Sequence, residues 1–262
     1  MNAFRVHVDV TGDVGRLRWD EQAVEALEVE GLQRAIDQAA DAALIEGELR
    51  RLQVDLPATD HPARRAVQRS GFRLEGRLRA ARQVGPHQFV DVLVYARLAV
   101  DPVHGPLGFS GVLDTVLPTK RVIGHAVFRN SMGLVLLCET SYKADWELPG
   151  GVVERLESPG AGCRREVLEE TGLDHEFTQA SIIDWMPPSL GWSDAVEFIF
   201  DGGVLGERVA SGLRARDPEL LAVHWVPRDD IGGLVTPLTA RRIDLLLDGY
   251  LGMTENGYPL GR

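Results

Sequence analysis

The chain has 262 residues, of which 44% are hydrophobic and 26% are charged. This composition is that of an ordinary globular protein and excludes the disordered and fibrous classes. The formal net charge of -11 argues against a protein held on a nucleic acid polymer or an anionic membrane by a positive surface. A small anionic substrate is compatible with this charge, because divalent cations can mask both an acidic site and a phosphate.

Cysteine usage and the lack of apolar runs bear on the compartment. Cys138 and Cys163 are too few for a disulfide framework, and neither belongs to a CxxC pair. The N-terminal residues lack the charged, apolar and small-residue order of a secretory signal, and no apolar run approaches the roughly 20 residues that span a bilayer. We therefore expect a cytoplasmic protein with no membrane partner.

The first hundred residues combine helical and strand-like patterns. Residues 25–49 carry apolar residues at helical spacing, and a second helical stretch stops at Gly71. That helical stretch is residues 62–70, and the strand-like segments around it are residues 50–56, 72–82 and 89–100. We expect a small α+β domain over residues 1–100, followed by a linker over residues 101–119, where proline and glycine concentrate.

Strand-like and helical patterns recur over residues 120–250. The strand-like segments are residues 121–129, 133–140, 180–187, 194–203 and 222–227. A closing amphipathic helix is predicted to begin at Thr236, which is placed to cap it ahead of Pro237. This order predicts an α/β fold, an α/β/α sandwich around a mixed sheet, with residues 251–262 left as a C-terminal tail.

One segment of the second domain carries a fixed pattern of glycine, acidic, basic and apolar residues. Residues 151–173 read GVVERLESPGAGCRREVLEETGL and satisfy G-x5-E-x7-R-E-U-x-E-E-x-G-U, in which U is a bulky apolar residue. The matching positions are Gly151, Glu157, Arg165, Glu166, Val167, Glu169, Glu170, Gly172 and Leu173. A solvated glutamate-rich helix face is common, but it does not account for the glycines, the arginine and the spacing together.

Physical chemistry predicts that this segment is a helix with an acidic face. Ser158, which precedes a proline, is a helix start, and Gly172 is a helix stop. Between them Glu166, Glu169 and Glu170 are three and four residues apart, which places their carboxylates on one face. Like charges at this spacing cost roughly 0.2 to 0.5 kcal/mol per pair in an isolated helix, so a cation is expected among them. Hard oxygen ligands of this kind suit Mg²⁺ or Mn²⁺.

A single arginine adjoins the acidic face. Arg165 immediately precedes Glu166 in the sequence. Its guanidinium can make a charge-assisted hydrogen bond to Glu157 or to one of the helix carboxylates and fix the rotamer of that carboxylate. We assign Arg165 and Glu157 an orienting role among the catalytic residues.

The pattern of residues 151–173 resembles the Nudix box, and residues 120–250 are similar to a Nudix hydrolase. The metal ligands that the resemblance implies are Glu166, Glu169, Glu170 and the backbone carbonyl of Gly150 or Gly151. It also implies that Glu166 and Glu169 are catalytic, with Glu166 as one candidate for the general base.

The same resemblance implies a reaction. Water attacks a phosphorus atom of a nucleoside diphosphate derivative and releases a nucleoside phosphate and the phosphorylated remainder, with a divalent cation neutralising charge on the phosphoryl oxygens. ADP-ribose or a nucleotide sugar is the favoured substrate. The alternatives are a housecleaning nucleoside triphosphate pyrophosphohydrolase and a regulator that binds nucleotide without cleaving it.

Residues beyond the box are candidates for binding the substrate. Some Nudix hydrolases take the base from a later loop, where this chain offers Asp194, Glu197 and Glu219. Pro188 follows the box by the interval often seen in the ADP-ribose-cleaving branch, although a turn before residues 191–194 explains it equally well.

Three tryptophans are expected to flank the cleft. Trp192 is the favoured candidate for stacking on a base, whereas Trp146 and Trp185 are expected in the core. The predicted substrate-binding residues are Trp192, Pro188, Asp194 and Glu197.

Residues 31–100 are similar to the C-terminal half of a GNAT-type acetyltransferase. The stretch RSGFRLEG at residues 69–76 resembles the GF-xx-EG turn of that family. The Q/R-x-x-G-x-G/A turn that holds the pyrophosphate of an acyl-CoA at a helix N-terminus is missing before residue 60. We therefore expect a partial, non-catalytic domain that serves in a homodimer or covers the active site, with acetyltransferase activity as the alternative.

Overall fold

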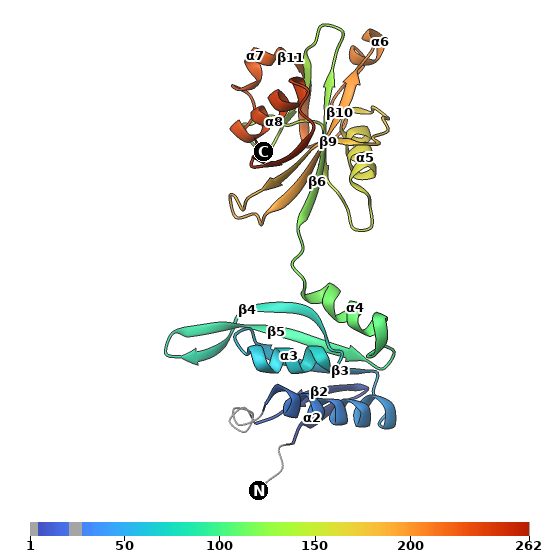
Figure 1. Cartoon of the computed structure of the whole chain (residues 1–262), viewed down its shortest axis with the longest axis vertical. Helices are drawn as coiled ribbons and strands as arrows, with labels where there is room; N and C mark the ends of the chain where they lie inside the picture. The colour runs from blue at the N-terminus through green and yellow to red at the C-terminus, as the bar shows by residue number, and fades with distance from the viewer. Residues whose placement is uncertain (1–4, 21–27, 262) are drawn as a thin grey trace. The chain divides into compact units, whose positions relative to one another are not determined.

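The computed structural model describes residues 5–20 and 28–261 of the chain. The chain forms two compact units, Met1–Pro118 and Thr119–Arg262, which are described separately below. Each unit is built on a β-sheet with helices packed against it (Figure 1). Among the described residues, no helix is long and apolar enough to cross a membrane.

The first unit contains a five-stranded sheet. Its strands are β1 (His7–Thr11), β2 (Val14–Arg18), β3 (Arg51–Pro57), β4 (Arg73–Gly85) and β5 (Gln88–Leu98). They lie in the order β1-β2-β3-β5-β4, and only the β2–β3 pair is parallel among them. The last three strands were predicted, whereas the hairpin of β1 and β2, which turns at Gly12 with a φ of 62°, was not.

The helices of the first unit are α2 (Val29–Asp41), α3 (His61–Arg69) and α4 (Gly105–Val116), with a π-helical turn η1 (Ala42–Glu46) after α2. The two helical stretches predicted before residue 71 are confirmed, although residues 25–27 of the first prediction lie outside the described residues. Asp60 caps α3 by accepting a hydrogen bond from the Ala63 N–H at 3.0 Å. Leu32, Ile36 and Phe72 are among the side chains of the buried core.

The predicted linker over residues 101–119 was wrong. Helix α4 occupies most of it, and the Leu74 N–H donates to Thr115 Oγ1 at 3.0 Å, which fixes the helix to β4. A proline in the first turn does not break a helix. Gly108 is required by packing, because a Cβ there would lie 2.4 Å from the carbonyl carbon of Val103. Proline and glycine therefore serve the helix start and a close contact here.

The second unit contains an eight-stranded mixed sheet. Its strands are β6 (Arg121–Arg129), β7 (Val135–Thr140), β8 (Gly150–Val152), β9 (Ala180–Met186), β10 (Ala195–Val204), β11 (Leu220–Val226), β12 (Gly252–Glu255) and β13 (Tyr258–Pro259). The order is β11-β7-β6-β10-β9-β12-β13, with β8 paired to β6. The pairs β6–β10 and β9–β12 are parallel and the others antiparallel.

Helices cover both faces of this sheet (Figure 1). They are α5 (Pro159–Thr171), α6 (Glu207–Ala210), α7 (Arg228–Ile231) and α8 (Pro237–Leu247). On β6, Ala126 and Phe128 belong to the apolar cluster that contains Val167 of α5, whereas Val127 belongs to the cluster that contains Ile243 of α8. Alternate residues of one strand thus face different helices, and the predicted α/β fold with a mixed sheet is confirmed.

The predicted C-terminal tail was also wrong, because β12 and β13 extend the sheet. β12 pairs with β9, and the hairpin to β13 turns at Asn256 and Gly257, both of which have a positive φ. Asn-Gly is a strong hairpin signal, so this element was open to prediction from the sequence. Thr254 and Gly257 also bond to Asp184 of β9, which ties the end of the chain to the sheet interior.

Candidate active site on helix α5

The helix predicted from the box is present with the predicted ends. Ser158 Oγ accepts a hydrogen bond from the Ala161 N–H at 3.3 Å, and Gly172 ends the helix in the left-handed conformation at a φ of 75°. Cys163 and Val167 are buried against the sheet. A Cβ at Gly124 of β6 would lie 3.0 Å from the Cβ of Cys163, so glycine there lets α5 pack closely on the strand.

The two glycines of β8 bring backbone against the acidic face of α5. The Gly150 N–H donates to Glu170 Oε2 at 2.8 Å. At Gly150 the φ is 130°, and a Cβ would lie 2.2 Å from the carbonyl oxygen of Gly124. A Cβ at Gly151 would lie 2.9 Å from Glu166 Cδ. Any side chain at either position would therefore displace the strand or a carboxylate.

Arg165 is the centre of a hydrogen-bonded cluster of carboxylates. Its Nε and Nη2 donate to the two oxygens of Glu157, both at 3.1 Å. Its Nη1 donates to Glu166 Oε1 at 2.8 Å and to Glu169 Oε2 at 3.2 Å, and Nη2 also donates to the Val152 carbonyl. The guanidinium lowers the pKa of Glu157 through the hydrogen bond between them. The orienting role of Arg165 and Glu157 stays a prediction.

The three helix carboxylates differ in exposure. The side chain of Glu169 is 53% exposed and that of Glu166 is 23% exposed. Burial raises the pKa of Glu170 to about 7, against the opposing effect of the Gly150 N–H. The nearby Glu166 carboxylate also raises the pKa of Glu170, since like charges in one site disfavour the charged form.

The residues of this face suit a hard divalent cation. Within the described part of the chain, no three His, Cys, Asp or Glu side chains already form a closed cage for a metal ion. Mg²⁺ usually keeps several waters and binds through one or two carboxylates plus phosphate oxygens, so it needs no such cage. The acidic face offers carboxylate oxygens for that mode of binding, and Gly150 and Gly151 bring the backbone of β8 into close contact with it.

The loop between β9 and β10 holds most of the predicted substrate-binding residues. Trp192 is 63% exposed, and the Arg121 guanidinium lies 4.7 Å from the centre of its ring. Asp194 forms an ion pair with Lys120 and accepts a hydrogen bond from Trp185 Nε1 at 3.2 Å. Pro188 lies on the same loop, next to the backbone bridge between Ser189 and Trp192. The predicted roles of these residues stay predictions.

The two tryptophans expected in the core differ in their exposure. Trp185 is 39% exposed at the end of β9, so its placement in the core was wrong. Trp146 is half-buried against the apolar cluster on the α8 side and stacks on His224 with ring centres 4.2 Å apart. Glu219, a candidate base, is exposed just before β11.

Glu197 lies within the strand predicted at residues 194–203 and not in a loop, so the structure corrects its expected place as a loop carboxylate. It is part of β10, its side chain is 4% exposed, and both of its oxygens are engaged in ion pairs. His125 Nδ1 lies 2.9 Å from Glu197 Oε1, and Arg242 Nη1 lies 2.7 Å from Glu197 Oε2. A carboxylate held in this way is not free to contact a substrate in this structure.

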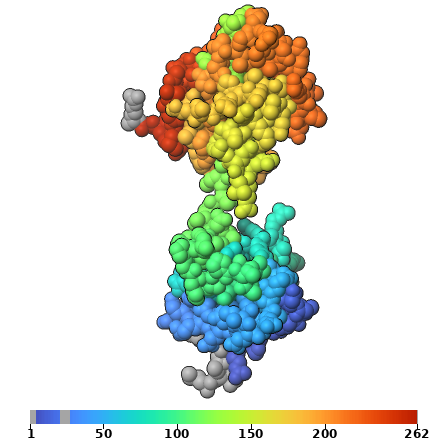
Figure 2. Space-filling model, turned by 90° about the vertical axis from the view of Figure 1, so that its right-hand side faces the viewer, coloured from blue at the N-terminus to red at the C-terminus, as the bar shows by residue number. Residues whose placement is uncertain are grey.

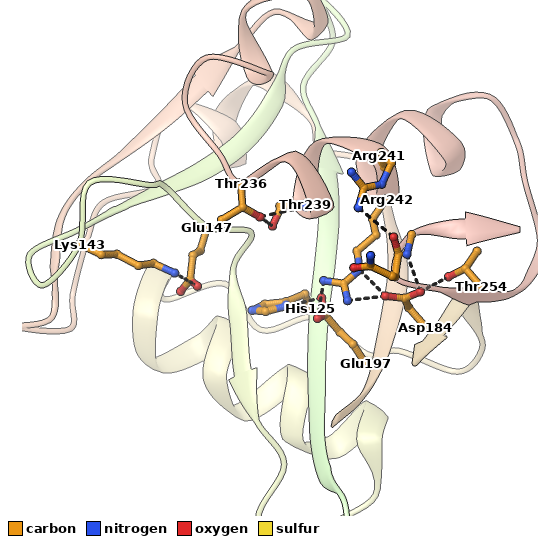
Figure 3. Close-up of polar contacts among 12 residues, drawn as sticks. His125, Lys143, Glu147, Asp184, Glu197, Thr236, Thr239, Arg241, Arg242 and Thr254 are labelled. Carbon is orange, nitrogen blue, oxygen red and sulfur yellow. Dashed lines mark hydrogen bonds and ion pairs between the residues drawn. The ribbon is translucent and has the colours of Figure 1, made fainter. Parts of the chain in front are cut away.

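Glu197 belongs to a buried polar chain across the sheet, shown in Figure 3. Arg242 of α8 also donates to Asp184 Oδ2, from Nε at 2.9 Å, and Asp184 Oδ1 accepts from Thr254 Oγ1. Burial raises the pKa of Glu197, but His125 and Arg242 outweigh it, so the pKa is lowered. The sequence contained a signal for these buried polar contacts, because His125, Asp184 and Glu197 are polar residues inside otherwise apolar strands.

A family model and several known proteins match the second unit. The model of the NUDIX domain family matches residues 118–248, which is half of the chain. The chain is similar to a MutT-like protein of Streptomyces ambofaciens, 33% identical over 136 residues that cover 50% of this chain and 80% of the relative. It is also similar to an RNA pyrophosphohydrolase of Roseobacter denitrificans, 26% identical over 150 residues that cover 51% of this chain and 92% of the relative.

A human relative, nucleoside diphosphate-linked moiety X motif 6, is 30% identical over 135 residues, which cover 49% of this chain and 41% of the relative. Among solved structures, a MutT protein from Methanosarcina mazei Go1 is 27% identical, with 51% of this chain and 96% of that chain covered and a TM-score of 0.43. The chain belongs to the NUDIX domain family. By class it is a hydrolase that acts on pyrophosphate bonds. The family match does not extend over the first unit, and the acetyltransferase resemblance of residues 31–100 stays a prediction.

Proposed function

We propose that the chain hydrolyses the diphosphate linkage of a nucleoside diphosphate derivative, of the ADP-ribose or nucleotide-sugar type, with Mg²⁺ or Mn²⁺ bound at the acidic face of α5. The observation that supports this most is the cluster in which Arg165 orders Glu157, Glu166 and Glu169 while β8 lies against the same face. The name of the human relative refers to a nucleoside diphosphate linked to another moiety, which is the same kind of bond.

The residues of the cluster have different roles in the reaction. Arg165 holds Glu166 and Glu169 in fixed rotamers, and Glu157 holds Arg165. Glu166 accepts a proton from the attacking water as the water oxygen bonds to phosphorus. The anhydride P–O bond then breaks, and its electron pair leaves with the departing phosphate. A bound divalent cation neutralises the diphosphate and lowers the pKa of the attacking water.

A divalent cation also resolves the electrostatics of the face. Glu166, Glu169 and Glu170 together carry more negative charge than the single guanidinium of Arg165 can offset. These three carboxylates would hold a divalent cation, which would remove the repulsion between them and bind phosphate oxygens of the substrate. Gly150 contributes backbone to this site, with its N–H already committed to Glu170.

Two alternative functions predicted from the sequence would give different experimental results. A nucleoside triphosphate pyrophosphohydrolase shares the site and differs in the substrate it turns over. A regulator binds a nucleotide at this site and releases no product. The cytoplasmic location, a homodimer and a non-catalytic first unit stay predictions from the sequence.

A screen of the purified chain tests the proposal. We expect turnover of ADP-ribose or of a nucleotide sugar in the presence of Mg²⁺, measured as nucleoside monophosphate by chromatography, and its loss when EDTA is added in excess. The panel should include dinucleoside polyphosphates, NADH and oxidised nucleoside triphosphates, with acetyl-CoA consumption followed in parallel. Turnover confined to triphosphates would support the alternative enzyme, and an absence of any phosphate-containing product would contradict the proposal.

Replacing Trp192 by Ala is expected to raise KM by about tenfold and to leave kcat within about twofold, because stacking of a base on an aromatic ring is worth about 1–3 kcal/mol. Trp192 is 63% exposed, so the fold should tolerate the change. Leu190→Ala, on the same loop and 97% exposed, is the matched control and should leave both constants unchanged. An unchanged KM in Trp192→Ala on every substrate of the panel would remove Trp192 from the site.

A further inference from the structure

A cavity lies in the first unit and is formed by residues of that unit alone. Its volume is about 580 Å³, within the range of small-molecule sites. Helices α2, α3 and α4 form its walls, and Figure 2 shows the green surface of α4 beside the blue surface of the first unit. The residues that give it chemical character are Gln33, Arg65, Gln68, Arg69, His104 and Phe109.

The wall next to α4 depends on two glycines. A Cβ at Gly108 would lie 2.4 Å from the carbonyl carbon of Val103, and a Cβ at Gly71 would lie 3.0 Å from Val103 Cγ1. Gly71 also has a φ of 83°, which a larger residue rarely adopts. Val103 is therefore held close to the end of α3 and to the first turn of α4, so close packing fixes this wall of the cavity.

The charge of the cavity is opposite to that of the chain. Its lining includes Arg65 and Arg69 and contains no aspartate or glutamate, although the chain carries a net charge of -11. The two arginines are one helical turn apart on α3 and repel each other. Arg69 pairs with Glu30 at 2.9 Å, whereas Arg65 has no carboxylate at ion-pair distance among the described residues. An anion between them would balance this charge.

The other lining residues specify the rest of the ligand. Phe109 is 69% exposed and offers an aromatic face on which a planar ring can stack. Gln33 and Gln68 present amides suited to the polar edge of a heterocycle, and Gln68 Nε2 also donates to Tyr95 at 3.2 Å. A long aliphatic chain would leave these amides without partners, so the set favours a phosphate joined to a heterocyclic base.

We propose that the cavity of the first unit is a second ligand site that binds a nucleoside monophosphate. Arg65 and Arg69 hold the phosphate, Phe109 stacks on the base, and Gln33 and Gln68 bond to its edge or to the ribose. This site is separate in residues from the acidic face of α5 and needs no metal ion.

Calorimetric titration of the 262-residue chain with AMP, GMP, UMP and CMP in excess EDTA tests the proposal. EDTA removes divalent cations, so binding at the acidic face of α5 is suppressed and the result does not depend on hydrolysis. We expect one saturable site for at least one monophosphate, and weaker binding of both its free nucleoside and inorganic phosphate. Arg65→Gln and Arg69→Gln should each weaken binding by about tenfold.

Matched variants make the outcome decisive. Arg79→Gln removes an exposed arginine of β4 that does not line the cavity, and it should leave the affinity unchanged. Circular dichroism of each variant shows whether its fold is retained, and Phe109→Ala gives an independent loss of affinity at an exposed position. The proposal is overturned if no monophosphate binds saturably, if Arg65→Gln/Arg69→Gln binds as the parent does, or if Glu169→Gln abolishes the binding.

Discussion

Replacing Glu169 by Gln is expected to lower kcat by about 100- to 1000-fold, the range found when one group that stabilises developing charge is removed from an active site. A carboxamide keeps the shape of the side chain and loses the charge that holds a cation. The free energy of unfolding should change little, because the Glu169 side chain is 53% exposed. Steady-state rates at saturating Mg²⁺ and substrate measure the effect, and Glu166→Gln should behave in the same way.

A control is available just beyond the same helix. Glu176 is 78% exposed and pairs with Arg164 at 2.9 Å. It follows Gly172 in the sequence and so lies beyond the end of α5. Glu176→Gln removes the same charge from the chain and should keep kcat within about twofold, because exposed ion pairs contribute little. If Glu169→Gln retained the parent's kcat, the acidic face of α5 would not be the catalytic site.

Replacing Arg242 by Met is expected to lower the free energy of unfolding by about 3–5 kcal/mol, the cost of removing one partner from a buried ion pair. The side chains of Arg242, Asp184 and Glu197 are at most 4% exposed. The variant would leave two buried carboxylates without their common cation. Urea denaturation followed by tryptophan fluorescence measures the loss, since all tryptophans except Trp19 lie in the second unit.

Arg228 provides the matched control for this prediction. It also pairs with two carboxylates, those of Asp244 and Asp248, both at 2.7 Å, but its side chain is 42% exposed. Arg228→Met should cost less than about 1 kcal/mol. A second variant, Asp184→Asn/Glu197→Gln/Arg242→Met, should recover part of the stability, because it removes the unpaired charges together with the cation. If Arg242→Met and Arg228→Met lowered the free energy of unfolding equally, burial of the Arg242 ion pairs would have no effect on stability and the prediction would be wrong.

The parts of the site that the sequence predicted are those fixed by local spacing. Ser158 and Gly172 set the ends of α5, and the helical period alone places Glu166 and Glu169 on one face. The contact of Arg165 with Glu157 follows from their separation of eight residues only once the chain has turned between them. Local rules therefore sufficed for the acidic face.

The parts that were missed depend on contacts between distant segments. Arg242 and Glu197 are far apart in sequence, and only the packing of α8 on β10 brings them together. Residues 101–119 were predicted to be a linker because proline and glycine concentrate there, and the contact with Val103 that requires Gly108 is not visible in the sequence. For β12 and β13 the Asn-Gly turn was a usable local signal, but their strands are too short to show alternation.

The most direct test of the central claim is phosphorus NMR of the products formed from ADP-ribose with Mg²⁺ in water enriched in ¹⁸O, for the parent and for Glu169→Gln. We expect the parent to cleave the anhydride to AMP and ribose phosphate, with ¹⁸O in one of the two new phosphate groups, and Glu169→Gln to leave the diphosphate signals intact over the same time. The same spectra from a nucleotide sugar cover the other favoured substrate. Intact diphosphates in the parent reaction with both substrates, or products formed equally by Glu169→Gln, would contradict it.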